Sequence, residues 1–118
     1  MSEDIKIIKE KISQDDLLSF LNKPFPEMIK FVVDVERRLI AFGGEMHADA
    51  EQVLIEDGSR QINLWGGNIY PKLEGEERFE FISLINIRPS QNNRSMEIQD
   101  QEVKEKMMAI ITELIEKK

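Results

Sequence analysis

The stretch "MIKFVVDVERRLIAFGG", residues 28 to 44, decides the fold class, because it fits either one helix or two strands. One helical face would carry five of its apolar residues: Met28, Val32, Val35, Leu39 and Phe42. The residue types favour strands instead, since β-branched and aromatic side chains fill its first half and suit a pleated sheet. We predict two antiparallel strands that turn between Glu36 and Arg38, followed by a bend at the glycine pair 43 to 44.

Before this hairpin, the sequence predicts a short strand and a short helix. The strand covers "DIKIIK", residues 4 to 9, where apolar and charged residues alternate. Ser13 and Asp16 have the spacing of a capping box, in which a serine side chain opens a helix. Pro24 and Pro26 should end this helix, because proline lacks the backbone N–H that a helix needs.

After the hairpin, we expect one helix and two strands. Asp49 is placed to cap the helix, and Gly58 suits the left-handed turn that would end it. A strand through "QVLIE", residues 52 to 56, is the alternative. The stretches "GGNIYPK" at 66 to 72 and "RFEFISLINIRP" at 78 to 89 are predicted to pair as strands. The second is apolar on both faces at its centre, which predicts a position inside the sheet.

The C-terminal segment predicts an amphipathic helix over residues 101 to 116, with Asp100 at its N-cap. Its apolar stripe consists of Val103, Met107, Ile110, Ile111 and Leu114. Helices interspersed with hairpins predict an α+β fold in a single domain over residues 1 to 118. We expect a mainly antiparallel sheet of about four to five strands, packed by about two to three helices that include the C-terminal one.

The amino-acid composition excludes several kinds of functional site and partner. The 118 residues include no cysteine, which excludes disulfide scaffolds, thiol nucleophiles and zinc sites built on thiolates. The net charge of −7 repels phosphate backbones, so we expect no nucleic-acid partner. The N-terminus lacks the basic start and apolar core of a signal peptide, and no apolar run reaches membrane-spanning length. We therefore expect a cytoplasmic protein without a membrane partner. Phosphate-loop and GxGxxG motifs are absent, so we expect no cofactor.

Six stretches together resemble one family: "VVDVE" at 32 to 36, "GGEMHAD" at 43 to 49, "EDGS" at 56 to 59, "LWG" at 64 to 66, "NIYP" at 68 to 71 and "INIRPSQNNRS" at 85 to 95. They are similar to a family of small prokaryotic proteins catalogued only as a domain of unknown function. The resemblance covers nearly the whole chain and implies a single-domain protein. It implies no activity, cofactor or partner.

The loop "NIRPSQNNRS", residues 86 to 95, is the first candidate binding site. Arg88 and Arg94 carry planar guanidinium groups that match carboxylate or phosphate oxygens in two-point contacts. Neutral hydrogen-bonding groups accompany them on Ser90, Gln91, Asn92, Asn93 and Ser95. The alternative is a solvated loop with a left-handed turn at the asparagine pair. In that case the arginines would pair with Glu97 or Asp100.

His47, the only histidine, is the candidate catalytic residue. Just before a helix capped by Asp49, its imidazole would stay neutral and could act as a general base. The alternative is a histidine whose ring nitrogens satisfy nearby backbone groups. An extended backbone would instead place Glu45, His47 and Asp49 on one face with metal-ligand chemistry, but with no second histidine we expect no metal site.

Trp65 and Tyr70 flank a glycine pair in "LWGGNIYP", residues 64 to 71. They could form the walls of a pocket for a planar ligand. Core packing beside a turn is the alternative, and we favour it because large aromatic side chains in a small domain are usually buried.

These features predict a small binding or regulatory domain whose ligand is an anion or a polar metabolite. The residues expected to hold it are Arg88, Ser90, Asn92, Arg94 and Ser95. The alternative is a small hydrolase or phosphoryl-transfer enzyme, in which His47 is the general base and the two arginines stabilise negative charge. That mechanism requires all three side chains around one cleft. A homodimer formed through a strand edge or an apolar patch is a third hypothesis.

Overall fold

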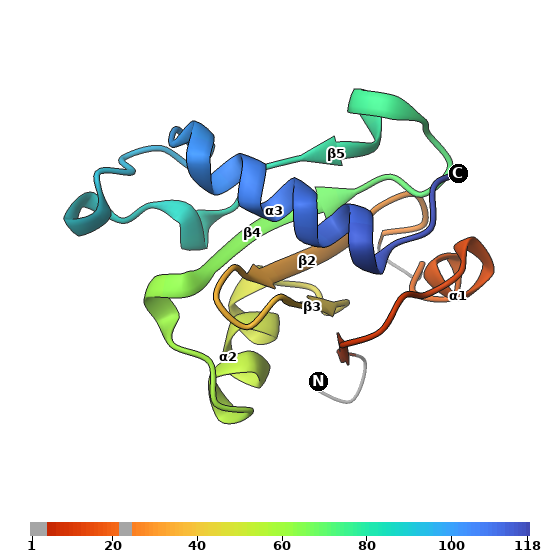
Figure 1. Cartoon of the computed structure of the whole chain (residues 1–118), viewed down its shortest axis with the longest axis horizontal. Helices are drawn as coiled ribbons and strands as arrows, with labels where there is room; N and C mark the ends of the chain where they lie inside the picture. Colours follow the sequence, from red (N-terminus) through yellow and green to blue (C-terminus); the bar gives the residue numbers. More distant parts are fainter. Residues whose placement is uncertain (1–4, 22–24) are drawn as a thin grey trace.

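A computed structural model describes residues 5–21 and 25–118 and has an α+β fold (Figure 1). Within these residues the sheet has five strands: β1 (Lys6–Ile8), β2 (Ile29–Asp34), β3 (Leu39–Phe42), β4 (Leu64–Ile69) and β5 (Phe79–Glu80). Their order is β1-β3-β2-β4-β5, and all neighbouring pairs are antiparallel. The helices are α1 (Gln14–Leu18), α2 (His47–Glu56) and α3 (Gln101–Leu114). The predicted fold class is confirmed.

The hairpin predicted within residues 28 to 44 is confirmed as β2 and β3. Its turn is held by the buried Asp34 carboxylate. Asp34 Oδ1 accepts hydrogen bonds from the backbone N–H groups of Glu36 and Arg37, each at 2.9 Å. Arg38 closes the turn with a left-handed backbone at φ +57°. The carboxylate therefore supplies the acceptor that directs the chain back into β3.

Alternate side chains of the sheet enter two separate cores. On one face the largest buried side chains are Phe31, Phe42 and Trp65, which pack against α3 where it crosses the sheet in Figure 1. On the other face, a smaller core joins the sheet to α2 and contains Val32, Ala41, Ala50, Leu54 and Leu64. The sheet is therefore the middle layer between α3 and α2.

The two ends of the described chain are tied together beside α3. The Ile12 N–H donates to the Leu114 carbonyl at 2.9 Å, and the Glu116 N–H donates to the Ile12 carbonyl at 3.1 Å. These bonds form a parallel bridge that lies outside the five-stranded sheet. Asp4, in the predicted first strand, and Pro24, predicted to follow the first helix, lie outside the described residues.

Three predicted helix signals are confirmed. Ser13 accepts a hydrogen bond from the Asp16 N–H at the start of α1, and Asp100 accepts one from the Glu102 N–H at the start of α3. Gly58, at φ +110°, makes the left-handed turn that ends α2. Each of these side chains or turns satisfies backbone groups that a helix end leaves without partners.

The predicted cap at Asp49 is wrong. Helix α2 begins at His47, and its N-cap is Met46, three residues before Asp49. Met46 has an extended backbone and makes no side-chain capping hydrogen bond. Asp49 lies in the first turn, where its charge interacts favourably with the helix dipole. Because His47 and Asp49 are both helical, the alternating face that would combine them with Glu45 does not form.

The long inner strand predicted after residue 78 is also wrong. β5 has two residues and lies at the edge of the sheet. The Ser83 side chain accepts a hydrogen bond from the Ile85 N–H and opens a 3₁₀ turn over Leu84–Asn86. The prediction of an inner strand assumed that apolar residues on both faces of this stretch are buried. Leu84, on the second face, is 68% exposed.

The apolar stripe of α3 is confirmed. Four of its residues are buried in the larger core: Met107, Ile110, Ile111 and Leu114. Val103 is half-buried and packs against the same core.

Replacing Ile111 with Asp should unfold the protein, because it would bury a carboxylate that has no partner in the larger core. Thr112→Asp is the matched control, since Thr112 is the exposed neighbour on the same helix. Thermal melting followed by circular dichroism will compare the two variants. A wild-type melting temperature for Ile111→Asp would show that the buried face of α3 is assigned wrongly.

Candidate functional site

The Arg88 guanidinium is buried against the protein itself. Its Nε donates to the Ile85 carbonyl at 3.0 Å, and its Nη1 donates to the Gln61 carbonyl at 2.9 Å. Its Nη2 donates to the Leu64 carbonyl at the start of β4. The Arg88 side chain, expected to hold a ligand, thus binds three backbone carbonyls from two stretches of the chain.

The positive charge of Arg88 also has partners within the fold. The Glu51 carboxylate of α2 lies 3.6 Å from Arg88 Nη2, and the guanidinium carbon lies 4.6 Å from the centre of the Trp65 ring. Burial lowers the pKa of Arg88 and raises that of Glu51, while the mutual attraction of the pair opposes both shifts. The acidic partner is Glu51, and neither Glu97 nor Asp100 takes that place.

Two asparagines that the sequence did not single out as structural hold this loop in place. The buried Asn86 side chain accepts from the Gly66 N–H at 2.8 Å and donates to the Gly66 carbonyl at 3.0 Å. It therefore pairs with β4 as a neighbouring strand would. The buried Asn93 amide donates to the Asn86 carbonyl at 2.8 Å and accepts from the Gln99 N–H at 2.8 Å.

The other predicted ligand-binding residues of the loop lie nearer the solvent. Ser90, Asn92 and Arg94 are exposed, and Asn92 makes the left-handed turn at φ +62°. Ser95 is half-buried and its hydroxyl accepts from the Glu97 N–H at 3.1 Å. The structure therefore separates these groups from the buried Arg88 guanidinium.

His47 is the first residue of α2 and is 8% exposed. Its Nε2 lies 2.7 Å from the Gly67 carbonyl, which makes this nitrogen the donor in the neutral ring. Burial is the largest of the effects that lower its pKa from 6.5 to about 4. A Cβ on Gly66 would lie 3.1 Å from the imidazole and 2.8 Å from Ser83 Cβ, so this close packing depends on the glycine. His47 thus satisfies a backbone group, as the alternative interpretation expected.

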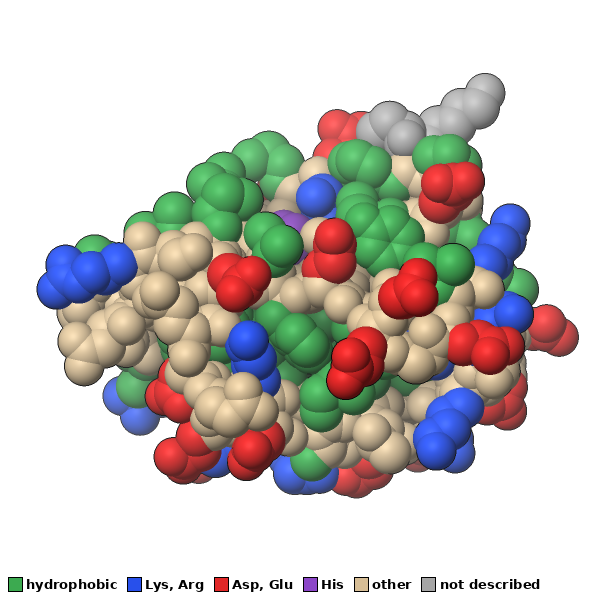
Figure 2. Space-filling view, turned by 90° about the horizontal axis from the view of Figure 1, so that it is seen from above, with side chains coloured by type: hydrophobic (Ala, Val, Ile, Leu, Met, Phe, Trp, Pro, Cys, Tyr) green, Lys and Arg blue, Asp and Glu red, His purple; other side chains and the backbone are tan. Residues whose placement is uncertain are grey.

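His47 lines a small cavity of about 300 Å³, which we call the His47 cavity. Its other polar residues are Lys30, Glu45, Asn68 and Ser83, and its apolar residues include Met46, Leu84 and Met96. Figure 2 shows the imidazole as a small purple area among hydrophobic side chains. Neither Arg88 nor Arg94 lines this cavity, so the structure does not bring the three residues of the enzyme hypothesis together.

Trp65 and Tyr70 do not face each other across a pocket. Trp65 is buried in the larger core, as the core-packing interpretation expected. The half-buried Tyr70 donates its hydroxyl hydrogen to Glu80 Oε1 at 2.9 Å. Within residues 5–21 and 25–118, no three His, Asp or Glu side chains cluster closely enough to hold a metal ion.

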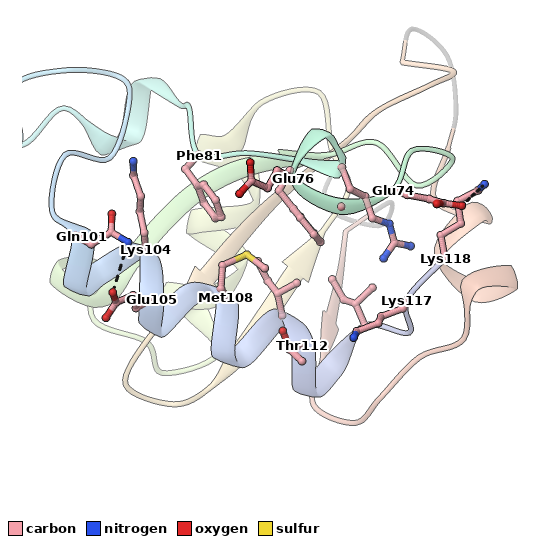
Figure 3. Close-up of a pocket in the computed structure, with 15 residues that line it drawn as sticks. Glu74, Glu76, Phe81, Gln101, Lys104, Glu105, Met108, Thr112, Lys117 and Lys118 are labelled. Carbon is pink, nitrogen blue, oxygen red and sulfur yellow. Dashed lines mark hydrogen bonds and ion pairs between the residues drawn. The ribbon is translucent and has the colours of Figure 1, made fainter.

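A larger cavity of about 780 Å³ lies between α3 and the segment that contains β5 (Figure 3). We call it the α3 cavity. Its volume falls within the range of about 300–1,000 Å³ that is usual for small-molecule sites. Its apolar walls consist of Phe79, Phe81, Met108, Ile111 and Ile115. Its charged residues are Glu74, Glu76, Arg78, Lys104, Glu105, Lys117 and Lys118.

Arg78 is the unusual member of this cavity, because it is only 4% exposed and no carboxylate in the described part of the chain balances its charge. Its Nη1 donates to the Glu116 carbonyl at 3.0 Å, and its Nη2 donates to Gln14 Oε1. Both partners are neutral. Among the residues that the structure describes, no carboxylate forms an ion pair with Arg78, and its buried Nε–H has no acceptor. Burial lowers the pKa of Arg78.

Sequence reasoning missed Arg78. The residue follows Glu76 and Glu77, a context that is typical of a solvated charged turn. Its burial arises because Gln14 and Glu116, from opposite ends of the sequence, close over it. No local pattern contains that information, since the separations are 64 and 38 residues.

The chain matches a known protein family over most of its length. Residues 6–114 match the family described as Protein of unknown function (DUF5674). The chain belongs to this family. The matched region includes Arg78, Arg88 and the whole His47 cavity, whereas Glu116 and the last residues of the α3 cavity lie beyond it. No curated protein and no solved structure matches the chain. None of the described helices is long and apolar enough to cross a membrane.

We expect the stability of the domain to fall as the pH is lowered from about 6.5 to about 4. The folded protein keeps His47 neutral down to pH about 4, whereas the unfolded chain protonates it near 6.5. In this window the unfolded state binds more protons, so acid favours unfolding by up to about 3 kcal/mol.

Urea denaturation at a series of pH values will measure the free energy of unfolding of the wild-type protein and of the His47→Gln variant. The difference between the two proteins isolates His47, because the chain has no other histidine and the carboxylates are common to both. Parallel pH profiles for the two proteins would refute the lowered pKa.

Arg88→Ala should lower the free energy of unfolding by about 3–5 kcal/mol, because it leaves the buried Glu51 carboxylate and several carbonyls without partners. The exposed Arg94 is the control, and Arg94→Ala should change stability by less than about 0.5 kcal/mol. Chemical denaturation measures both. Equal stabilities for the two variants would contradict the structural role of Arg88.

Proposed function

We propose that this protein is a non-enzymatic binding domain that holds a small anionic ligand in the α3 cavity, with Arg78 as the main anchor. The sequence also predicts an anionic ligand, but it places the ligand on the loop of residues 86 to 95 rather than in the α3 cavity. The supporting observation is the buried Arg78 cation, which has no carboxylate partner among the described residues.

The cost of burying Arg78 favours a functional role. Removing a charged group from water is costly unless an opposite charge and hydrogen bonds compensate for it. Both guanidinium groups lie over an aromatic ring, Arg88 over Trp65 and Arg78 over Phe79 at 5.8 Å. Arg88 also has the Glu51 carboxylate, whereas Arg78 has two neutral acceptors and a buried Nε–H without an acceptor among the described residues. An anion in the cavity would supply the counter-charge.

The loop of residues 86 to 95 is less suited to this role. Arg88 donates to carbonyls that the fold itself needs to satisfy, so a ligand would have to replace those bonds. The enzyme alternative requires His47 beside Arg88 and Arg94, and the His47 cavity contains neither. We therefore propose binding without catalysis. A cytoplasmic location and a homodimer stay predictions.

Thermal-shift and calorimetric titrations with inorganic phosphate and small carboxylates will test the proposal. We expect them to stabilise the wild-type protein, because a ligand that binds only the folded state raises its stability. Arg78→Gln should abolish the stabilisation, and Arg94→Ala should retain it.

Gln14→Ala is the structural control, because it removes one hydrogen bond from Arg78 and leaves the charge in place. It should still bind the anion. Wild-type affinity in Arg78→Gln, or loss of binding in Arg94→Ala alone, would reject the α3 cavity as the site.

A further inference from the structure

We infer that the ligand of the α3 cavity is an amphiphile with one acid head group and one unbranched alkyl chain that lies along α3. The inference rests on the proposed function and adds the chemical class of the ligand. It follows from the length of the cavity, its apolar middle and the distribution of charge at its rim.

The cavity follows α3 along nearly its whole length. The helix residues that line it recur every three or four positions and include Lys104, Met108, Ile111 and Ile115. A helix of 14 residues such as α3 is about 21 Å long. In Figure 3, Lys104 lies toward one end and Lys117 toward the other. A compact anion would fill only a small part of this space.

The middle of the cavity is apolar on both sides. Phe81 lies across from Met108 in Figure 3, and both side chains are half-buried against the larger core. The fold therefore leaves apolar surface uncovered along the floor and walls of the cavity. A hydrocarbon chain would remove that surface from water, whereas a polar ligand of the same length would not.

An alkyl chain fits these walls better than a peptide. The backbone N–H and C=O groups of α3 are used within the helix, so this wall offers no partners to a peptide backbone. A peptide placed here would lose hydrogen bonds to water along that side without replacing them. A hydrocarbon chain has no such groups to satisfy.

The charge at the rim favours a single acid group. Arg78 interacts with the carbonyl of Glu116, just beyond the C-terminal end of α3. The other charges of the lining balance one another: Glu74, Glu76 and Glu105 are matched in number by Lys104, Lys117 and Lys118. Arg78 is therefore the one positive charge of the lining that no acidic lining residue offsets. Lys118 is already 3.5 Å from Glu74 (Figure 3). The head group therefore belongs at Arg78, with an uncharged chain beyond it.

A chain-length series will test this inference by calorimetry, using butanoate, octanoate and dodecanoate below their micellar concentrations. The dissociation constant should fall by about two- to fourfold for each added methylene, where the upper value corresponds to complete burial. Met108→Gln should weaken dodecanoate strongly and butanoate little. Met96→Gln is the matched control, because Met96 lies outside the α3 cavity, and it should bind like wild type.

The same titrations will include three control compounds. Octanol and dodecanol test the need for the acid group, and a short apolar peptide with a free C-terminal carboxylate tests the need for the alkyl chain. Equal affinities along the series, with binding still lost in Arg78→Gln, would overturn the alkyl chain and leave the anion site intact. A peptide that binds more tightly than dodecanoate would also overturn it. Alcohols that bind as tightly as the acids, independently of Arg78, would overturn the proposed function itself. Absence of binding by every compound would overturn both.

Discussion

Along most of the outer edge of β4, side chains make the hydrogen bonds that a neighbouring strand would otherwise make. Much of the molecule depends on these bonds. β5 pairs with the far end of β4 for only two residues. Beyond it, the Asn86 amide binds both the N–H and the carbonyl of Gly66, and the Arg88 guanidinium binds the carbonyl of Leu64. Buried backbone groups need such partners, so the irregular segment after β5 is held as firmly as a strand.

This arrangement accounts for the different roles of the two buried arginines. Arg88 closes the sheet edge, and its charge is balanced by Glu51 and by the face of Trp65. Arg78 lies earlier in the segment that joins β4 to α3. Among the described residues it has the face of Phe79 and two neutral acceptors, and no carboxylate forms an ion pair with it. The two arginines are buried to a similar degree. They differ in whether the fold balances the positive charge, and this difference separates the structural role of Arg88 from the binding role proposed for Arg78.

Sequence reasoning succeeded where the decisive interactions are local. The turn between Glu36 and Arg38, the Asp100 cap and the stripe of α3 were predicted, and each depends on residues a few positions apart. The role of Asp34 in holding that turn was not predicted. The cap at Asp49 failed because helix α2 begins in response to packing of His47 against Gly67, 20 residues away. The strand after residue 78 failed because Asn86 replaces backbone pairing with side-chain pairing, which apolar alternation does not report. Arg78 could not be identified, because its environment is formed by Gln14 and Glu116.

The parallel bridge near Ile12 has a consequence for synthesis of the protein in the cell. Ile12 exchanges hydrogen bonds with Leu114 and Glu116. The ribosome therefore synthesises Ile12 long before it synthesises these two partners. A growing chain can form the β2–β3 hairpin early and can pack α1 against it, but the hydrogen bonds of Ile12 must wait until α3 has been translated. The bridge therefore fixes the N-terminal segment later than the hairpin forms, and a chain without the end of α3 would leave the backbone groups of Ile12 without these partners.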